Sequence, residues 1–143
     1  MPLIANWPGT TPAGAICKDL VDFSDMLPTF AELGGATLPT ERKIDGHSYA
    51  PQLRGEPGQP REWAYVQLGD KRYVRSPRWK LTGDGQFFDM SDAPFRQIAV
   101  TAGPGDAEAK AARLKLQATL DSLKSDDGAN APARKKRKKK DKK

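Results

Sequence analysis

Proline and glycine interrupt this chain so often that only short regular elements can form over most of its length. Of the 143 residues, 13 are glycine and 12 are proline, and most of them lie before residue 105. Together they exceed the roughly 12 % of average usage. Proline lacks a backbone N–H and glycine costs conformational entropy inside helices and strands, so both mark turns and the ends of elements. The length allows one ordinary domain with a single core, which we expect to be rich in loops.

Positive charge is concentrated at the C-terminus. Residues 134–143 hold nine basic residues and one acidic residue, whereas residues 1–133 hold 15 basic and 17 acidic ones. The net charge of +6 therefore describes a tail, and a nucleic-acid fold that is basic throughout is disfavoured. From residue 125 the composition is polar and then almost purely basic, which predicts a disordered tail. Its candidate polyanion-binding residues are Arg134, Lys135, Lys136, Arg137, Lys138, Lys139 and Lys140.

The sequence contains no signal for a disulfide framework, a zinc site or a membrane span. Cys17 is the single cysteine, which excludes an intramolecular disulfide and leaves no Cys/His cluster for a metal. No run of about 20 apolar residues is present, as a transmembrane helix requires. Met1 is not followed by a cationic region and an unbroken apolar stretch, so we expect no signal peptide in this chain. These features leave the cellular compartment undetermined.

The first third of the chain predicts one strand, one helix and a loop. Residues 2–7 (PLIANW) are mostly apolar and end at Pro8-Gly9, which favours a buried strand. A helix is indicated after Ser24-Asp25, which can cap it, and before Gly34-Gly35, which can end it. The apolar residues that trace one face at helical spacing are Leu20, Phe23, Leu27 and Phe30. Residues 38–58 are interrupted by prolines and glycines and predict an ordered loop with room for one helical turn.

The remainder predicts a small antiparallel sheet followed by a helix. Segments 62–68, 71–82 and 86–90 have strand composition and are separated by the short glycine-containing connections that hairpins use. Pro77 cannot donate to a sheet ladder, so we expect the middle segment to bulge or bend there. Residues 106–124 predict a helix with Asp106 as its N-cap. Its leucines Leu116, Leu120 and Leu123 share a face that can pack against the sheet.

Four short patterns, in order, give the chain a resemblance to a known family. They are an apolar strand that ends in Trp7-Pro8-Gly9, a proline-containing helix over 25–34, a D-G-x-S-x-x-P-x-L-x-G loop over 45–55, and a strand pair over 75–81 and 87–89. In this order and spacing, across about 125 residues, they resemble the C-terminal part of type I sulfatases, the arylsulfatase-like enzymes.

The resemblance implies a large α/β hydrolase in which a cysteine oxidised to formylglycine attacks sulfur and a calcium ion neutralises the sulfate. Cys17 is followed by Lys18-Asp19-Leu20 and does not match the C-x-P-S-R or C-x-A-S-R motif of the family's nucleophile. The motifs that supply the family's calcium ligands do not occur here either. We therefore expect no catalytic and no metal-binding residue in this chain, and the nucleophile and calcium ligands to lie upstream of residue 1. Family members are usually exported or periplasmic.

Three groups of polar residues are possible site residues. His47, the only histidine, lies in the D-G-x-S loop and is a candidate for the rim of the substrate pocket, although a surface or loop-packing role is the simpler interpretation. Asp19, Asp22 and Asp25 are spaced by three, and we favour a solvated acidic helix face over a metal site, because hard cations usually need six or more converging oxygens. A basic row, in which a solvated face is favoured over a polyanion-binding strand, comprises Arg72, Arg75, Arg78 and Lys80.

The fold class expected is therefore α+β, with about three antiparallel strands packed on a C-terminal helix. Residues 1–36 would be the last strand and helix of the sulfatase α/β domain, 37–61 an ordered loop, 62–124 the sheet with its helix, and 125–143 the tail. The main functional hypothesis is the C-terminal part of a sulfuric-ester hydrolase that is inactive alone and has the remainder of the sulfatase domain as its partner. The alternative is a non-catalytic module that binds anionic polysaccharide or another polyanion through its tail.

Overall fold

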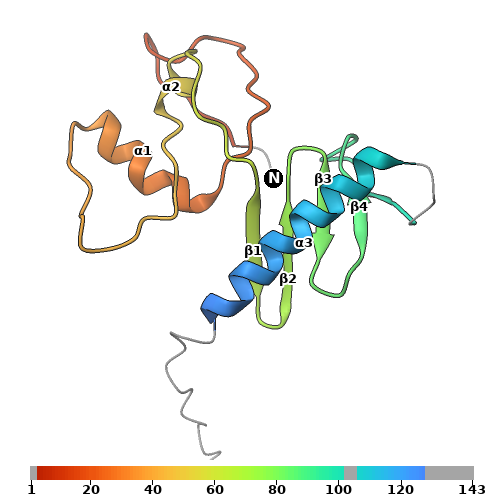
Figure 1. Cartoon of the computed structure of the whole chain (residues 1–143). Coiled ribbons are helices and arrows are strands. Elements are labelled where there is room, and N and C mark those ends of the chain that lie inside the picture. The colour runs from red at the N-terminus through yellow and green to blue at the C-terminus, as the bar shows by residue number, and fades with distance from the viewer. Residues whose placement is uncertain (1–2, 102–105, 128–143) are drawn as a thin grey trace, which may run out of the picture.

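The computed structural model describes residues 3–101 and 106–127 (Figure 1). Its fold is α+β. An antiparallel sheet is covered on one face by a long C-terminal helix, and an N-terminal half with short helices lies beside the first strand. In chain order the elements are η1 (Phe23–Asp25), α1 (Met26–Leu33), α2 (Ala50–Leu53), β1 (Ala64–Leu68), β2 (Lys71–Arg75), β3 (Trp79–Thr82), β4 (Phe87–Asp89), β5 (Ile98–Ala99) and α3 (Ala107–Asp127).

The sheet has five strands in the order β1-β2-β3-β4-β5, each antiparallel to its neighbour. The sequence predicted about three strands, and the difference has two sources. The segment 71–82 turns back on itself at Pro77, where the Ser76 N–H donates to the Trp79 carbonyl at 2.8 Å, so one expected strand becomes the hairpin β2–β3. The two-residue strand β5 is too short to give a period-2 pattern in the sequence.

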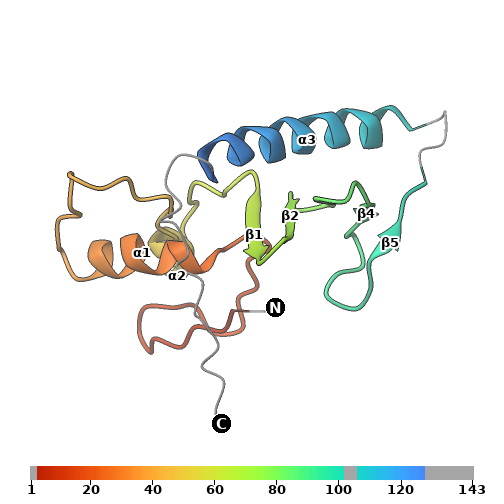
Figure 2. The same ribbon diagram turned by 90° about the horizontal axis from the view of Figure 1, so that it is seen from below.

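The hydrophobic core lies between the sheet and α3. Val74, Leu81 and Phe87 are cross-strand neighbours on one sheet face, and all three are at most 4 % exposed. Trp79 stacks on Phe87, with 5.2 Å between the ring centroids. Figure 2 shows α3 running over this face, and its side chains that complete the core are Ala109, Leu116 and Leu120.

The predicted helix over 106–124 is confirmed and extends to Asp127. Asp106 caps it as expected, because its carboxylate accepts a hydrogen bond from the Ala109 N–H at 3.1 Å. Leu116 and Leu120 are buried, whereas Leu123 is only half-buried. No helix in the described part of the chain is both long enough and apolar enough to cross a membrane.

The predicted N-terminal helix is also present, as η1 and α1. Asp22 caps η1 by accepting from the Ser24 N–H at 2.9 Å. Helix α1 ends at Leu33 with Gly34 as its C-cap, followed by Gly35 with φ +65°. Residues 3–7, expected to be a buried strand, form no strand here, and Ile4 is 88 % exposed. An extended segment needs a neighbouring strand to satisfy its backbone groups. That residues 2–7 form a strand within a larger sheet stays a prediction.

The core predicts opposite outcomes for two leucines of α3. Leu120→Ala removes a side chain that is 2 % exposed and leaves a cavity under the sheet, so we expect the free energy of unfolding to fall by about 2–5 kcal/mol. Leu114→Ala, the same change at a side chain that is 72 % exposed, should change it by less than about 0.5 kcal/mol. Urea unfolding followed by circular dichroism measures both, and equal losses would contradict this assignment of the core.

Candidate functional site

The loop that carries His47 is held in place by one buried carboxylate, that of Asp25. Asp25 is 2 % exposed and accepts hydrogen bonds from the backbone N–H groups of Asp22 and His47, both at 2.7 Å. The guanidinium of Arg61 completes the set, with Nε 3.2 Å from Oδ2 and Nη2 in contact with Oδ1. The Asp25 carboxylate thereby connects the start of α1, the D-G-x-S loop and the segment that leads into β1.

Arg61 is almost as buried as its partner. Its side chain is 9 % exposed, and its other N–H groups donate to the carbonyls of Trp63 and Asp45, both at 3.4 Å. A buried charge is costly unless it is paired and its hydrogen-bonding groups are satisfied. Both conditions are met here, so the ion pair can exist inside the protein and fix the three segments relative to one another.

The pKa of Asp25 reflects this arrangement. Burial alone would raise the pKa, but the hydrogen bonds from Arg61 and from the N–H groups of His47 and Asp22, together with the positive charge of Arg61, hold it below its usual value. The carboxylate is thus ionised at neutral pH. Nearby, burial and the charge of Asp25 raise the pKa of Tyr49, whose hydroxyl lies 2.9 Å from the Met26 sulfur.

A second connection and a close backbone contact position the same loop. The Thr29 hydroxyl donates to the Asp25 carbonyl at 2.7 Å and accepts from the Tyr49 N–H at 3.1 Å. A Cβ atom at Gly46 would lie 2.0 Å from the Ser24 carbonyl oxygen. Only glycine therefore fits at this position, which explains in physical terms the glycine of the D-G-x-S pattern.

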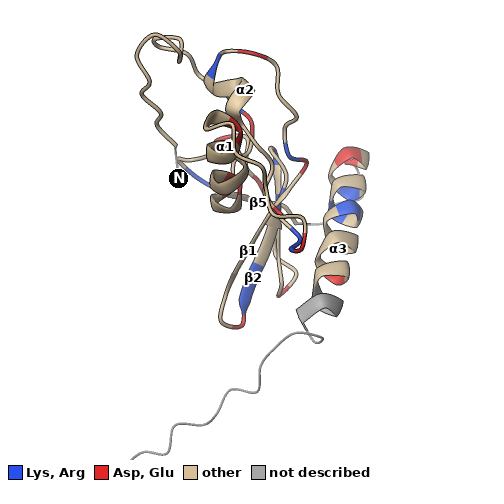
Figure 3. Cartoon of the chain, turned by 90° about the vertical axis from the view of Figure 1, so that its left-hand side faces the viewer, with Lys and Arg blue, Asp and Glu red and all other residues tan. Residues whose placement is uncertain are grey.

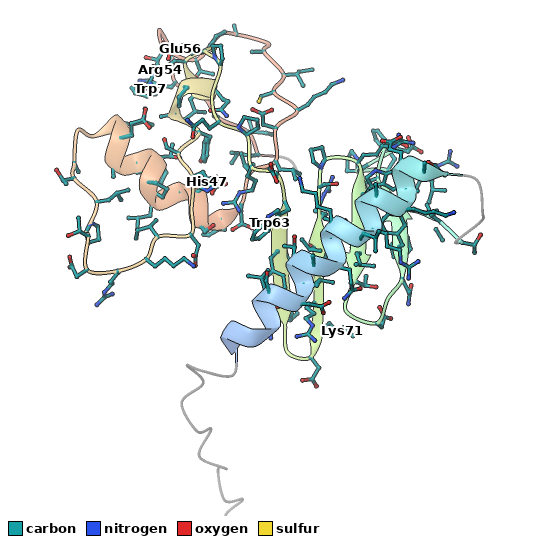
Figure 4. The ribbon with its side chains drawn as sticks, viewed as in Figure 1. Trp7, His47, Arg54, Glu56, Trp63 and Lys71 are labelled. Carbon is teal, nitrogen blue, oxygen red and sulfur yellow. The ribbon has the colours of Figure 1, made fainter. Side chains whose placement is uncertain are left out.

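His47 itself lies on the loop beside α1 (Figure 4). Its backbone is fixed by Asp25, whereas its side chain is exposed. Nothing in the described residues shows what the imidazole contacts in a complete pocket, so its role at a substrate rim stays a prediction. The backbone of His47 is fixed, and its imidazole is exposed to solvent.

The expectation of a solvated acidic face over Asp19, Asp22 and Asp25 is wrong for Asp25. This carboxylate points inward to Arg61, whereas Asp19 accepts a hydrogen bond from Gln52 at 3.1 Å and Asp22 caps η1. The three residues therefore have three separate structural roles. Within residues 3–101 and 106–127, no group of three or more His, Cys, Asp or Glu side chains is placed to hold a metal ion.

The basic row predicted on one strand is divided by the turn at Pro77. Arg72 and Arg75 are an odd number of residues apart in β2, so they lie on opposite faces of the sheet, and Arg78 lies in the turn between β2 and β3. Arg78 is paired with Asp89 at 3.2 Å and with Glu108 at 2.7 Å. Figure 3 shows the basic residues of β2 and the mixed charges of α3. The predicted tail residues, 134–140, lie outside the described part of the chain.

Sequence reasoning missed Arg61, although it placed Asp25 and Gly46 in its motifs. Arg61 lies between Pro60 and Glu62 in a segment without periodicity, and its partner is 36 residues away. No local signal connects two residues at that separation.

Curated proteins similar to this chain are sulfatases. Human arylsulfatase D is 34 % identical over 91 residues, which is 63 % of this chain and 15 % of that protein. Mouse steryl-sulfatase is 33 % identical over 131 residues, or 85 % of this chain and 21 % of that protein. Mouse arylsulfatase G is 32 % identical over 104 residues, which is 66 % of this chain and 20 % of that protein. The chain thus spans about a fifth or less of these relatives.

A solved structure shares the fold. It is a crystal structure of a candidate sulfatase from Bacteroides thetaiotaomicron, with a TM-score of 0.54 and 27 % identity, matched over 77 % of this chain and 27 % of that one. No family model matches the sequence. Together the relatives and the shared fold show a sulfatase-type chain. The chain is similar to arylsulfatase-like sulfatases over a part of their length, as its sequence patterns predicted.

The buried ion pair predicts that an almost isosteric substitution at Asp25 strongly lowers the stability of the fold. Asp25→Asn removes the negative charge and leaves Arg61 buried without a counter-ion, so we expect the free energy of unfolding to fall by about 3–5 kcal/mol. Asp70→Asn, the same change at an exposed turn residue, should cost less than about 0.5 kcal/mol. Chemical denaturation at pH 7 compares the two, and a small effect of Asp25→Asn would show that the pair is not needed.

Low pH should remove the stabilisation that the Asp25–Arg61 ion pair provides. The folded-state pKa of Asp25 is lowered below the 3.8 of an ordinary aspartate, so its stabilisation is complete above the unfolded-state pKa and is lost as the pH falls through the folded-state value. The difference in unfolding free energy between the unchanged chain and Asp25→Asn should therefore be constant from pH 7 to 5 and shrink below about pH 4. Urea unfolding across this range tests it. If this difference in unfolding free energy instead increased as the pH fell, the lowered pKa assigned to Asp25 would be contradicted.

Proposed function

We propose that this chain is the C-terminal part of a sulfuric-ester hydrolase of the arylsulfatase type and that it is not catalytic alone. The observation that carries the proposal is the match to sulfatases over as much as 85 % of this chain but only 15–21 % of their length. The order of the four sequence patterns supports a place at the C-terminal end of that family. The hydrolytic activity would belong to the whole enzyme.

The exposed face of α1 supports a partner that covers it. Phe23 is 85 % exposed, Leu27 55 % and Phe30 64 %, and their spacing places them along one side of η1 and α1. The sequence places these residues on one apolar face at helical spacing, and the described residues leave that face exposed. Exposed apolar surface of this extent marks a contact with another body. From the similarity to sulfatases, we infer that the remainder of the sulfatase domain covers this face.

In this proposal, the remainder of the sulfatase domain supplies the nucleophile and the calcium site. Residues 3–101 and 106–127 do not fit a calcium ion, since they bring no group of three or more acidic, histidine or cysteine side chains together. Cys17 is exposed and lacks the nucleophile motif. The contribution proposed for this chain is a fixed loop that presents His47 at the rim of the completed pocket, where an imidazole can donate a hydrogen bond to an anion.

The first test is turnover of p-nitrophenyl sulfate by the 143-residue chain with calcium present, and we expect none above the blank. A complete arylsulfatase assayed in parallel shows that the conditions support the reaction. Measurable turnover that disappears in Cys17→Ser would contradict the proposal, because it would place a nucleophile in this chain.

A second arm of the same test asks whether the chain can complete a sulfatase. Mouse arylsulfatase G with its matching 104-residue segment replaced by this chain should be soluble and hydrolyse the aryl sulfate. The same chimera with Phe30→Ser should lose soluble yield, whereas Leu114→Ser, at an exposed position on α3, should not. An inactive chimera that is nonetheless folded and binds calcium would count against the proposed role.

A further inference from the structure

The sheet face opposite α3 carries a pair of cations that the proposed function does not use. Cross-strand pairing places Arg75 beside Lys80, Lys80 beside Phe88, and Tyr73 beside Thr82. These side chains alternate with the core residues Val74, Leu81 and Phe87, so they lie on the face that α3 does not cover (Figure 2). We refer to Tyr73, Arg75, Lys80 and Phe88 together as the open-face cluster.

Arg75 and Lys80 have no acidic partner among the described residues. Within residues 3–101 and 106–127, the guanidinium of Arg75 donates to the carbonyls of Ser76 at 3.4 Å and Pro77 at 3.3 Å. Lys80 donates to the side-chain oxygen of Gln97 at 2.8 Å. By contrast, Arg54, Arg61 and Arg78 all pair with carboxylates. The two cations of the cluster are thus half-buried neighbours that no carboxylate in the described part of the chain neutralises.

Two neighbouring positive charges, those of Arg75 and Lys80, repel each other when no anion lies between them. Like charges directly opposite each other destabilise an antiparallel pair. Partial burial and the charge of Arg75 lower the pKa of Lys80, which is the expected response of an ammonium group beside another cation. An anion placed between the two side chains would offset both costs.

The cations are also held in place before any ligand arrives. The Lys80 ammonium lies 4.3 Å from the centroid of the Tyr73 ring and 5.8 Å from that of Phe88, in the range of cation–π contacts. The hydrogen bonds to Gln97, Ser76 and Pro77 restrict the two side chains further. Binding to restricted side chains loses less conformational entropy, which favours affinity.

We propose that Arg75 and Lys80 form an anion-binding site for a sulfate group of a sulfated polysaccharide, with Tyr73 and Phe88 providing apolar surface beside the sugar. The choice of sulfate rests on the proposed function. A guanidinium and an ammonium together match the oxygens of a small oxyanion, because the guanidinium offers two parallel donors and the ammonium a concentrated charge. Two cations on one face are too few for a nucleic-acid strand, which needs a basic groove that tracks the backbone.

The test uses the full chain and a readout at the cluster itself. A sulfated heparin tetrasaccharide is titrated while the Tyr73 and Phe88 ring signals and the Lys80 side-chain signal are followed by NMR. We expect Arg75→Gln and Lys80→Gln each to weaken binding at these signals about tenfold, the loss of one charge-assisted contact. Lys80→Arg should retain most of the affinity.

The control variants carry the same loss of charge elsewhere. Arg72→Gln lies on the same strand but on the opposite face, and Lys18→Gln lies in the exposed N-terminal loop, so neither should change the response at the cluster. Because every variant keeps residues 134–143, general attraction to the basic tail is matched throughout. Unchanged amide signals of Val74 and Leu81 confirm that the sheet is intact.

Several results would overturn the proposal. Equal losses in all four Gln variants would show only a general effect of net charge, and absent shifts at Tyr73 and Phe88 would show that the cluster is not the site. Equal binding of unsulfated hyaluronan tetrasaccharide or of a short single-stranded DNA would remove the assignment to sulfate. The readout is local binding and not turnover, so failure of the arylsulfatase chimera would leave this result unaffected.

Discussion

The buried ion pair between Asp25 and Arg61 organises the N-terminal half of the molecule. That half has few large apolar side chains inside, and its buried residues include Pro28, Thr29, Tyr49 and Ala50. Such a small core provides little hydrophobic stabilisation. Hydrogen bonds to one ionised carboxylate instead connect a helix start, a loop and the approach to the sheet. The arrangement depends on complete satisfaction of both charges, because a buried ion without its partner is strongly destabilising.

The C-terminal half follows the more usual rule that apolar burial supplies the stability. Its helix and its strands could be predicted from sequence because their signals are local: leucines at helical spacing, a capping aspartate, and short glycine turns between apolar strands. Pro77 shows the limit of such signals. A proline excludes a continuous ladder, but it does not tell a bulge from a reversal, and the structure has a reversal with a Ser76–Trp79 hydrogen bond.

The candidate site was less accessible to sequence reasoning than the fold. Asp25 stood in a series of acids spaced by three, which suggested solvent, because charged residues are seldom buried without a partner. Its partner lies 36 residues away, and nothing in a single sequence reports that contact. His47 and Gly46 were located through their motif, yet the reason for the glycine, its contact with the Ser24 carbonyl, is visible only in three dimensions.

The contact between Gly46 and the Ser24–Asp25 backbone has a mechanical consequence. Helix α1 begins at Met26 directly after this contact, and its exposed apolar side is the surface that we assign to the remainder of the enzyme. The backbone against which the His47 loop packs is therefore the same backbone that starts the helix with this exposed side. Because Asp25 connects the start of α1 with the His47 backbone, a substitution that displaces α1 should also displace the His47 loop, even where it does not contact the histidine.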